Sequence, residues 1–198
     1  MFVATCQFIL ASASPRRRQL LQALGLHCDC FAADIDETPL HGETPVAFAM
    51  RMAGAKADAV AATQAPSACV IGADTVVCID DHILGKPADR REAMHFLQLL
   101  NGRTHTVITA YALRVRERHL EVSQYASTLV RFGHFTNSVL QAYANTDEPL
   151  DKAGAYAIQG CGAFLVAALN GSSTNVIGLP VHDLIKHLLA HRLIKTEI

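Results

Sequence analysis

The stretch FILASASPRRRQLL, Phe8–Leu21, joins a short apolar strand to a helix whose first turn carries three arginines. Pro15 suits the first helical position because its missing N–H would be unpaired there anyway. Ser14, just before it, is a favourable N-cap residue. The run Arg16–Arg18 then lies at the positive end of the helix dipole, where cations are unfavourable. An anion bound by the serines, the backbone N–H groups and the arginines would compensate, and phosphate fits this description.

The arginine run also has a simpler interpretation, in which the three side chains only solvate an exposed helix end. Consecutive residues of a helix point about 100° apart, so three neighbours cannot all face one ligand. We therefore expect at least one of the three arginines to point to solvent, even if the helix start binds an anion.

Composition bounds the class of protein. The chain has 198 residues, of which 51% are hydrophobic and 18% charged, so we expect a folded globular protein with a sizeable core. A formal net charge of −1 argues against a general nucleic-acid binder, whose surface is strongly basic. The sequence shows neither a signal-peptide pattern nor an apolar run long enough to span a bilayer. These features predict a soluble, cytoplasmic protein with six reduced cysteines and no membrane partner.

Strand and helix patterns alternate along the chain, which predicts an α/β fold. We expect residues 1–198 to form a single domain, composed of two lobes without a separable linker. The predicted helices begin at Pro15, Pro45, Asp89, Thr136 and Pro180, and they end near Leu24, Ala62, Leu100 and Ala144, with no end assigned to the last one. The predicted strands are Phe8–Ala11, Cys28–Ala32, Cys69–Ile79, His82–Leu84, Thr104–Val115, Ser123–Phe132 and Ala163–Leu169.

Asp74 is the second candidate functional residue, because it lies inside the apolar run CVIGADTVVCI of Cys69–Ile79. A carboxylate in a buried strand is costly unless it is paired, bound to a metal or placed at the mouth of the strand. Gly72, two residues earlier, would let another backbone or a ligand approach closely. Asp74 is therefore a candidate general base. The alternative is a structural aspartate that caps the neighbouring loop.

Three further polar residues lie in contexts that suit a nucleotide. Lys86 lies between a glycine and a proline, and Lys56 is the cation of a small-residue helix face. Each alone could be a solvated lysine, but together with the arginines they would supply point charges for a polyphosphate. Gln159, between Ile158 and Gly160, could read the edge of a base or could be an ordinary loop glutamine.

The chain resembles the Maf family of nucleoside triphosphate pyrophosphatases over essentially its full length. The resemblance implies a mixed, twisted sheet with flanking helices and two lobes around a cleft, an architecture like that of inosine triphosphatases (Maf/Ham1). Six motifs carry it in order: LASASPRR (Leu10–Arg17), GADTVV (Gly72–Val77), LGKP (Leu84–Pro87), NGRTHTVIT (Asn101–Thr109), DKAGAYAIQG (Asp151–Gly160) and NVIGLP (Asn175–Pro180).

The resemblance also implies an activity and a set of site residues. The reaction would release pyrophosphate from a nucleoside triphosphate, with Asp74 as the proton acceptor and a divalent cation, Mg²⁺ or Mn²⁺, as cofactor. An acidic turn at Asp34–Glu37 supplies Asp36 and Glu37 as candidate metal ligands. Arg18, outside the matched positions, is our choice for the solvent-facing arginine. The implied specificity residues are Arg16, Thr75 and Gln159, and the implied phosphate-binding residues are Ser12, Ser14, Arg17, Lys56 and Lys86.

Two branches of the family differ at the position of Gln159. This chain resembles the branch that prefers dTTP and UTP in its IQG tripeptide, whereas a branch specific for 7-methyl-GTP tends to carry glutamate there. A glutamine amide offers one donor and one acceptor, which match O4 and N3–H of uracil or thymine. Hydrolysis of 7-methyl-GTP or another modified nucleotide is the near alternative. The alternative from another functional class is a protein that binds nucleotides and regulates cell division and septum formation. Homodimers are common among such proteins.

Overall fold

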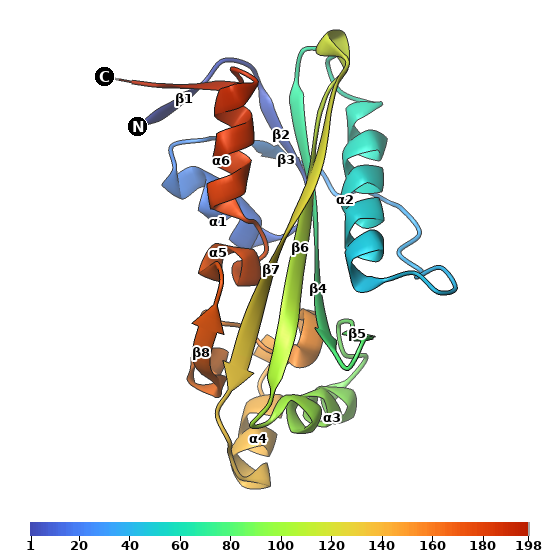
Figure 1. Ribbon diagram of the computed structural model, residues 1–198, viewed down its shortest axis with the longest axis vertical. Coiled ribbons are helices and arrows are strands. Elements are labelled where there is room, and N and C mark those ends of the chain that lie inside the picture. The colour runs from blue at the N-terminus through green and yellow to red at the C-terminus, as the bar shows by residue number, and fades with distance from the viewer. Residues whose placement is uncertain (198) are drawn as a thin grey trace. The chain divides into compact units, whose positions relative to one another are not determined.

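The computed structural model describes residues 1–197, in which strands and helices alternate along the chain (Figure 1). The α-helices are α1 (Pro15–Ala23), α2 (Pro45–Ala61), α3 (Arg90–Leu100), α4 (Asn137–Ala144), α5 (Ser173–Ile177) and α6 (Val181–Ala190). The strands are β1 (Phe2–Ala4), β2 (Phe8–Ala11), β3 (Asp29–Cys30), β4 (Cys69–Ile79), β5 (His82–Leu84), β6 (Thr104–Val115), β7 (Leu120–Phe132), β8 (Val166–Asn170) and β9 (Ile194–Thr196). Short 3₁₀ helices are η1 (Arg116–Arg118), η2 (Glu148–Asp151), η3 (Ala153–Ala155) and η4 (Cys161–Leu165).

The main sheet is mixed. Its strand order is β3-β2-β4-β6-β7-β8, with β5 paired to β4, and a second sheet pairs β1 with β9. β2 runs parallel to both β3 and β4, whereas β5 is antiparallel to β4 and β8 is antiparallel to β7. The predicted α/β class with a mixed sheet and flanking helices is confirmed.

The chain divides into two compact units, each with its own apolar core. Unit 1 contains residues 1–74, 109–126 and the described residues from Gly178 onward, and unit 2 contains Thr75–Ile108 and Ser127–Ile177. The core of unit 1 is centred on β2, β4, β6 and α6, with Leu10, Ile71 and Leu184 fully buried. The core of unit 2 includes Leu97 and Phe132. The chain crosses from unit 1 to unit 2 between Asp74 and Thr75, in the middle of β4.

Most predicted elements match, and the exceptions have local causes. The bounds of β4, β5 and β6 are those that the sequence predicts. The strand predicted to begin at Ser123 begins at Leu120, because His119 adopts a left-handed conformation that ends η1 and turns the chain early. The strand predicted over residues 163–169 is wrong in its first half. There the chain forms η4 up to Leu165 and only then β8, since a carboxylate binds the first N–H groups of η4.

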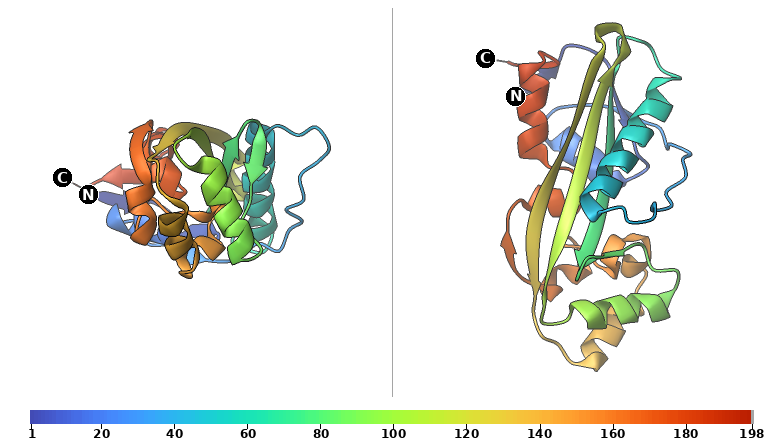
Figure 2. Two further views of the ribbon diagram at one scale, coloured as in Figure 1. Left: turned by 90° about the horizontal axis from the view of Figure 1, so that it is seen from below. Right: turned by 45° about the vertical axis from the view of Figure 1, so that its right-hand side comes forward.

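α2 is the longest described helix, with 17 residues, and it lies alongside β4 (Figure 2). Thr44 caps it by accepting a hydrogen bond from Ala47 N at 3.2 Å, and Pro45 occupies its first position. Several of its buried residues are small, Ala49, Ala53, Gly54 and Ala57 among them, so the helix can approach the sheet closely at these positions. Within residues 1–197, no helix combines the length and the apolar character that a membrane span requires.

Candidate functional site

Ser12 and Arg17 form a polar cluster at the start of α1. Ser12 follows β2 and is buried, and its Oγ accepts hydrogen bonds from Ser14 N at 3.2 Å and from Arg17 Nη1 at 3.0 Å. Arg17 Nε donates to the carbonyl oxygen of Gly178 at 2.8 Å. Ser12 Oγ and the carbonyl oxygen of Gly178 therefore help to hold the guanidinium in place.

The first turn of α1 carries the arginine run, and an anion bound there stays a prediction from the sequence. Ser14 is the N-cap of α1, but its side chain makes no capping hydrogen bond and the first turn carries no acidic residue. The side chains of Arg16 and Arg17 are half-buried, whereas Arg18 is exposed, as expected for the solvent-facing arginine. Burial lowers the pKa of Arg17, and the Asp74 carboxylate opposes this shift. Arginine starts from so high a pKa that it stays charged at neutral pH.

Gly72 explains how α2 reaches β4. A Cβ at position 72 would overlap the carbonyl oxygen of Ala53 and would lie 2.8 Å from Ala57 N. The prediction that another backbone approaches Gly72 is thus confirmed, and that backbone is α2. Lys56 lies three residues after Ala53 on the helix, and Asp74 lies two residues after Gly72 on the same face of the strand. The close approach brings these two side chains together.

Lys56 holds two carboxylates. Its Nζ lies 2.7 Å from Oδ1 of Asp74 and 2.8 Å from Oε1 of Glu37, which belongs to the segment between β3 and α2. The side chains of Lys56 and Asp74 are only 12% and 11% exposed, whereas Glu37 is 56% exposed. The ion pair compensates for the burial of a carboxylate in β4.

We expect Gly72→Ala to destabilise the protein by about 1–3 kcal/mol, because the new Cβ must push α2 away from β4. Urea unfolding monitored by circular dichroism measures the change. Gly85→Ala is the matched control, since a Cβ at position 85 meets no atom within 4 Å. Equal unfolding midpoints for the two variants would contradict the tight packing at Gly72.

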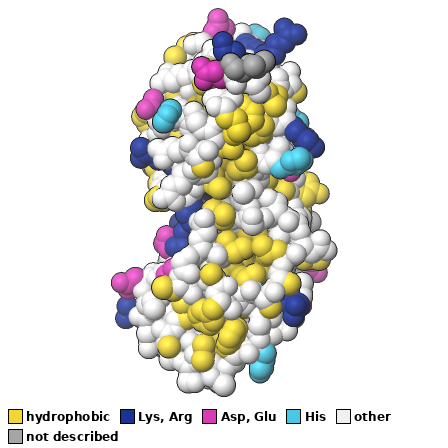
Figure 3. Space-filling model, turned by 90° about the vertical axis from the view of Figure 1, so that its left-hand side faces the viewer, with side chains coloured by type: hydrophobic (Ala, Val, Ile, Leu, Met, Phe, Trp, Pro, Cys, Tyr) yellow, Lys and Arg dark blue, Asp and Glu magenta, His cyan; other side chains and the backbone are white. Residues whose placement is uncertain are grey.

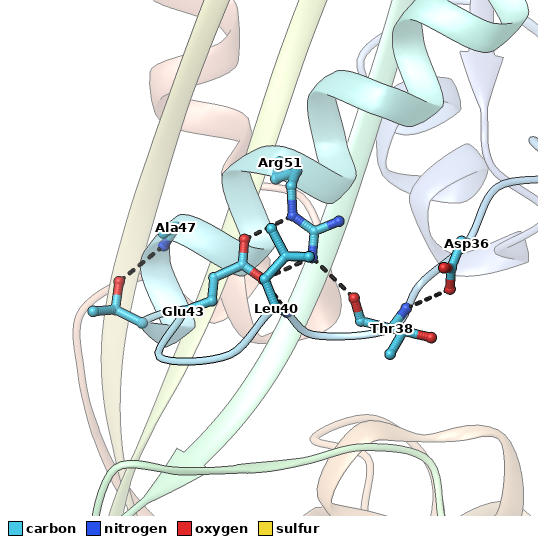
Figure 4. Close-up of polar contacts among 7 residues, drawn as sticks. Asp36, Thr38, Leu40, Glu43, Ala47 and Arg51 are labelled. Atoms are coloured by element: carbon cyan, nitrogen blue, oxygen red, sulfur yellow. Dashed lines mark hydrogen bonds and ion pairs between the residues drawn. The ribbon is translucent and has the colours of Figure 1, made fainter.

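Arg51 fixes the segment that carries Glu37. Its guanidinium donates to both carboxylate oxygens of Glu43, at 2.7 and 2.6 Å, and to the carbonyl oxygen of Thr38 at 3.0 Å (Figure 4). The bidentate contact lowers the pKa of Glu43 to about 2. Asp36 is turned toward its own loop, where Oδ1 accepts a hydrogen bond from Thr38 N at 2.9 Å. Of the two predicted metal ligands, Glu37 is therefore the one beside Lys56 and Asp74.

A metal ion in unit 1 would need ligands in addition to the side chains of the described residues. Within residues 1–197, no three His, Cys, Asp or Glu side chains come together as a metal site. Mg²⁺ is commonly held by one or two carboxylates and by substrate phosphates. Glu37, whose carboxylate is exposed, could supply one such ligand, with Lys56 Nζ at 2.8 Å from its Oε1 as a competing partner.

Unit 2 holds the other predicted residues, Thr75, Lys86 and Gln159. Thr75 follows Asp74 in β4 and is half-buried, and Lys86 is exposed in the turn after β5. The carbonyl oxygen of Gly85 accepts a hydrogen bond from Gly154 N at 3.0 Å. This bond joins the turn that carries Lys86 to the segment that leads to Gln159, which is itself exposed.

The residues that shape this segment were not predicted as functional from the sequence. His105 is buried and its Nε2 lies 2.7 Å from Oη of Tyr156. Burial lowers the pKa of His105 to about 4, so the ring is neutral at pH 7. Glu148 and Tyr143 also form hydrogen bonds with the segment. Most of these contacts join residues that lie at least 13 positions apart, so no local pattern indicates them.

The structure is thus that of an α/β protein in which three arginines lie at the start of a helix and a buried aspartate forms an ion pair with a lysine. The profile of the family described as Maf-like protein matches residues 7–191. A protein of Desulfotalea psychrophila named dTTP/UTP pyrophosphatase is 44% identical over 194 residues, which cover 98% of this chain and 99% of the relative. A protein of Myxococcus xanthus with the same name is 49% identical over 175 residues, covering 88% and 87%. The chain belongs to the Maf family.

A solved structure supports the predicted fold. The Ham1 protein of Staphylococcus aureus matches with a TM-score of 0.52 and 13% identity, over 94% of this chain and 99% of that one. At this identity the match concerns the fold alone, and it confirms the predicted Ham1-like architecture.

Proposed function

We propose that this protein hydrolyses nucleoside triphosphates, dTTP and UTP first among them, to the monophosphate and pyrophosphate. The observation that carries the proposal is the buried Asp74 carboxylate held by Lys56 at 2.7 Å. The full-length relatives named dTTP/UTP pyrophosphatase support the substrate class.

Asp74 acts as the general base in the proposed mechanism. Lys56 fixes its Oδ1, and we assign its Oδ2 to the attacking water. The water oxygen bonds to the α-phosphorus, its proton passes to Asp74, and the bond between the α-phosphorus and the bridging oxygen breaks. Pyrophosphate leaves with that oxygen. Arg17, Lys56 and Lys86 neutralise the charge that develops on the leaving group, and Ser12 and Ser14 bind phosphate oxygens.

We also propose that the reaction requires a divalent cation, Mg²⁺ or Mn²⁺. Glu37 would hold it together with phosphate oxygens, and Asp36 stays a prediction from the sequence. When bound, the cation supplies further neutralisation of the triphosphate.

The specificity residues of the proposal are Arg16, Thr75 and Gln159, with Gln159 pairing to the base. The substrate is a small molecule rather than a nucleic acid. On the face shown in Figure 3, basic side chains of the described residues lie in separate groups among acidic and hydrophobic ones and form no continuous band. We further propose that the protein is cytoplasmic, where its nucleotide substrates are found. We also propose that it forms a homodimer.

A pyrophosphate-release screen tests the function. It compares dTTP, UTP and the other standard triphosphates with methylated and damaged ones, each with Mg²⁺, with Mn²⁺ and with EDTA. We expect release from UTP and dTTP that requires a metal. Release of orthophosphate alone, or no turnover of any nucleotide, would contradict the proposal.

The arginine run supplies a second test. Arg17→Ala should raise the KM for UTP about tenfold, because it removes a charge-assisted contact to phosphate. Arg18→Ala should leave KM within about twofold, since this side chain is exposed. Steady-state kinetics on both variants, with melting temperatures as a folding control, measures the difference. If Arg18→Ala is the more damaging, the anion site is assigned to the wrong face of α1.

A further inference from the structure

The carboxylate of Glu148 accepts three hydrogen bonds inside unit 2. Glu148 begins η2, shortly after α4, and is half-buried. Its Oε1 accepts from Tyr143 Oη at 2.9 Å and from Gly162 N at 2.7 Å, and its Oε2 accepts from Cys161 N at 2.9 Å. Two of the three donors are backbone groups of η4, so the carboxylate caps the start of this short helix.

The same cluster ties both ends of the segment 157–162. Ala157 N donates to Tyr143 Oη at 3.3 Å, and the N–H groups of Cys161 and Gly162 donate to Glu148. Gln159 lies between these two anchor points and is exposed. Its own backbone is therefore held on both sides while its amide remains in contact with solvent.

The shape of the segment depends on Glu148 in a second way. Gly160 has a φ of +84°, and a Cβ at this position would overlap Oε2 of Glu148. The chain next to Gln159 thus packs directly against the carboxylate, in a conformation that favours glycine.

The pKa shifts of Glu148 and Tyr143 show which of the two donates the hydrogen bond at neutral pH. Burial raises the pKa of Glu148, but the N–H groups of Gly162 and Cys161 and the hydroxyl of Tyr143 outweigh it, and the net shift is downward. Burial and the neighbouring Glu148 raise the pKa of Tyr143. Glu148 is therefore the anionic acceptor and Tyr143 the donor between them.

We propose that Glu148 is a positioning residue for substrate selection: it holds the segment 157–162 so that the Gln159 amide meets the edge of a pyrimidine base. The inference rests on the proposed function, in which Gln159 pairs with the base. If the segment were loosely held, ordering it on binding would cost conformational entropy and weaken the affinity for the nucleotide. The Gln159 amide could also rotate and form hydrogen bonds with other bases.

Glu148→Gln is the test variant, because it keeps the shape of the side chain but turns one acceptor into a donor facing a backbone N–H. We expect the ratio of kcat/KM for UTP to kcat/KM for GTP to fall about tenfold, mainly through a higher KM for UTP. Glu121→Gln, at an exposed position on β7 in unit 1, is the matched control and should leave the ratio unchanged.

A double-mutant cycle separates positioning from general stability. If Glu148 acts through Gln159, then Glu148→Gln should not lower the UTP:GTP ratio further in a Gln159→Ala background. An equal loss of selectivity in both backgrounds, or an unchanged ratio in the single variant, would overturn the inference. If Glu148→Gln does not fold, Tyr143→Phe replaces it: this change leaves the carboxylate and frees Ala157 N, and an unchanged ratio there also overturns the inference. A wild-type protein that turns over no nucleotide rejects the proposed function instead.

Discussion

Asp74→Asn should lower kcat for UTP by about 10²- to 10⁴-fold, because the amide cannot accept the proton of the attacking water. The substitution keeps the shape of the side chain, and the amide oxygen can still accept the hydrogen bond that Lys56 Nζ gives to Oδ1 at 2.7 Å. α2 and β4 should therefore stay in contact, and KM should change only a few-fold. The loss should thus appear in the chemical step.

The measurement is steady-state pyrophosphate release, combined with calorimetric binding of a non-hydrolysable UTP analogue. Asp58→Asn is the matched control, since it removes a carboxylate of α2 that is 61% exposed and pairs with Arg114. Asp58 is not among the residues of the proposed site, so this variant should keep full activity. Near-normal turnover by Asp74→Asn would contradict the assignment of Asp74 as the general base.

The strongest signals in the sequence come from residues that break a local rule. Three arginines at a helix start and a carboxylate in a buried strand are visible without any structure, because each is unfavourable where it stands unless something compensates for it. Gly72 belongs to the same group, since a glycine in an apolar strand indicates a close approach. Turn residues lie beside three of the strands: Asp80 and Asp81 between β4 and β5, Gly85 after β5 and Gly102 before β6. The bounds of these strands could therefore be predicted to the residue.

The residues that were not predicted from the sequence act through long-range contacts. Glu148 binds the N–H groups of Cys161 and Gly162, and Arg51 binds Glu43, so neither role has a signature within a helical turn of the residue. The pairing of β1 with β9 joins two strands of three residues from opposite ends of the chain, too short for a pattern. The strand predicted from Ala163 failed for a related reason. An apolar run is compatible with a 3₁₀ turn, and here the carboxylate of Glu148 decides between them.

Gln159→Glu should lower kcat/KM for UTP roughly ten- to a hundredfold, an effect of about 1–3 kcal/mol. The glutamine amide offers a donor to O4 and an acceptor to N3–H of uracil, whereas a carboxylate offers acceptors only. N3–H keeps its partner, but O4 then faces an oxygen and is left unpaired. N1–H and the exocyclic amine of guanine are both donors, so guanine nucleotides should gain relative to UTP even if their absolute rates stay low.

Values of kcat/KM for UTP, dTTP, GTP and 7-methyl-GTP on both proteins decide the point. The control is Gln141→Glu, which adds the same charge to unit 2 at an exposed position of α4 whose amide bonds only Asn145 among the described residues. Because Ala157, Cys161 and Gly162 anchor the backbone around position 159, the new carboxylate should occupy the place of the amide rather than swing away. The order of substrate preference should therefore shift toward the methylated guanine, whose positive charge the carboxylate offsets. An unchanged order would mean that Gln159 does not read the base.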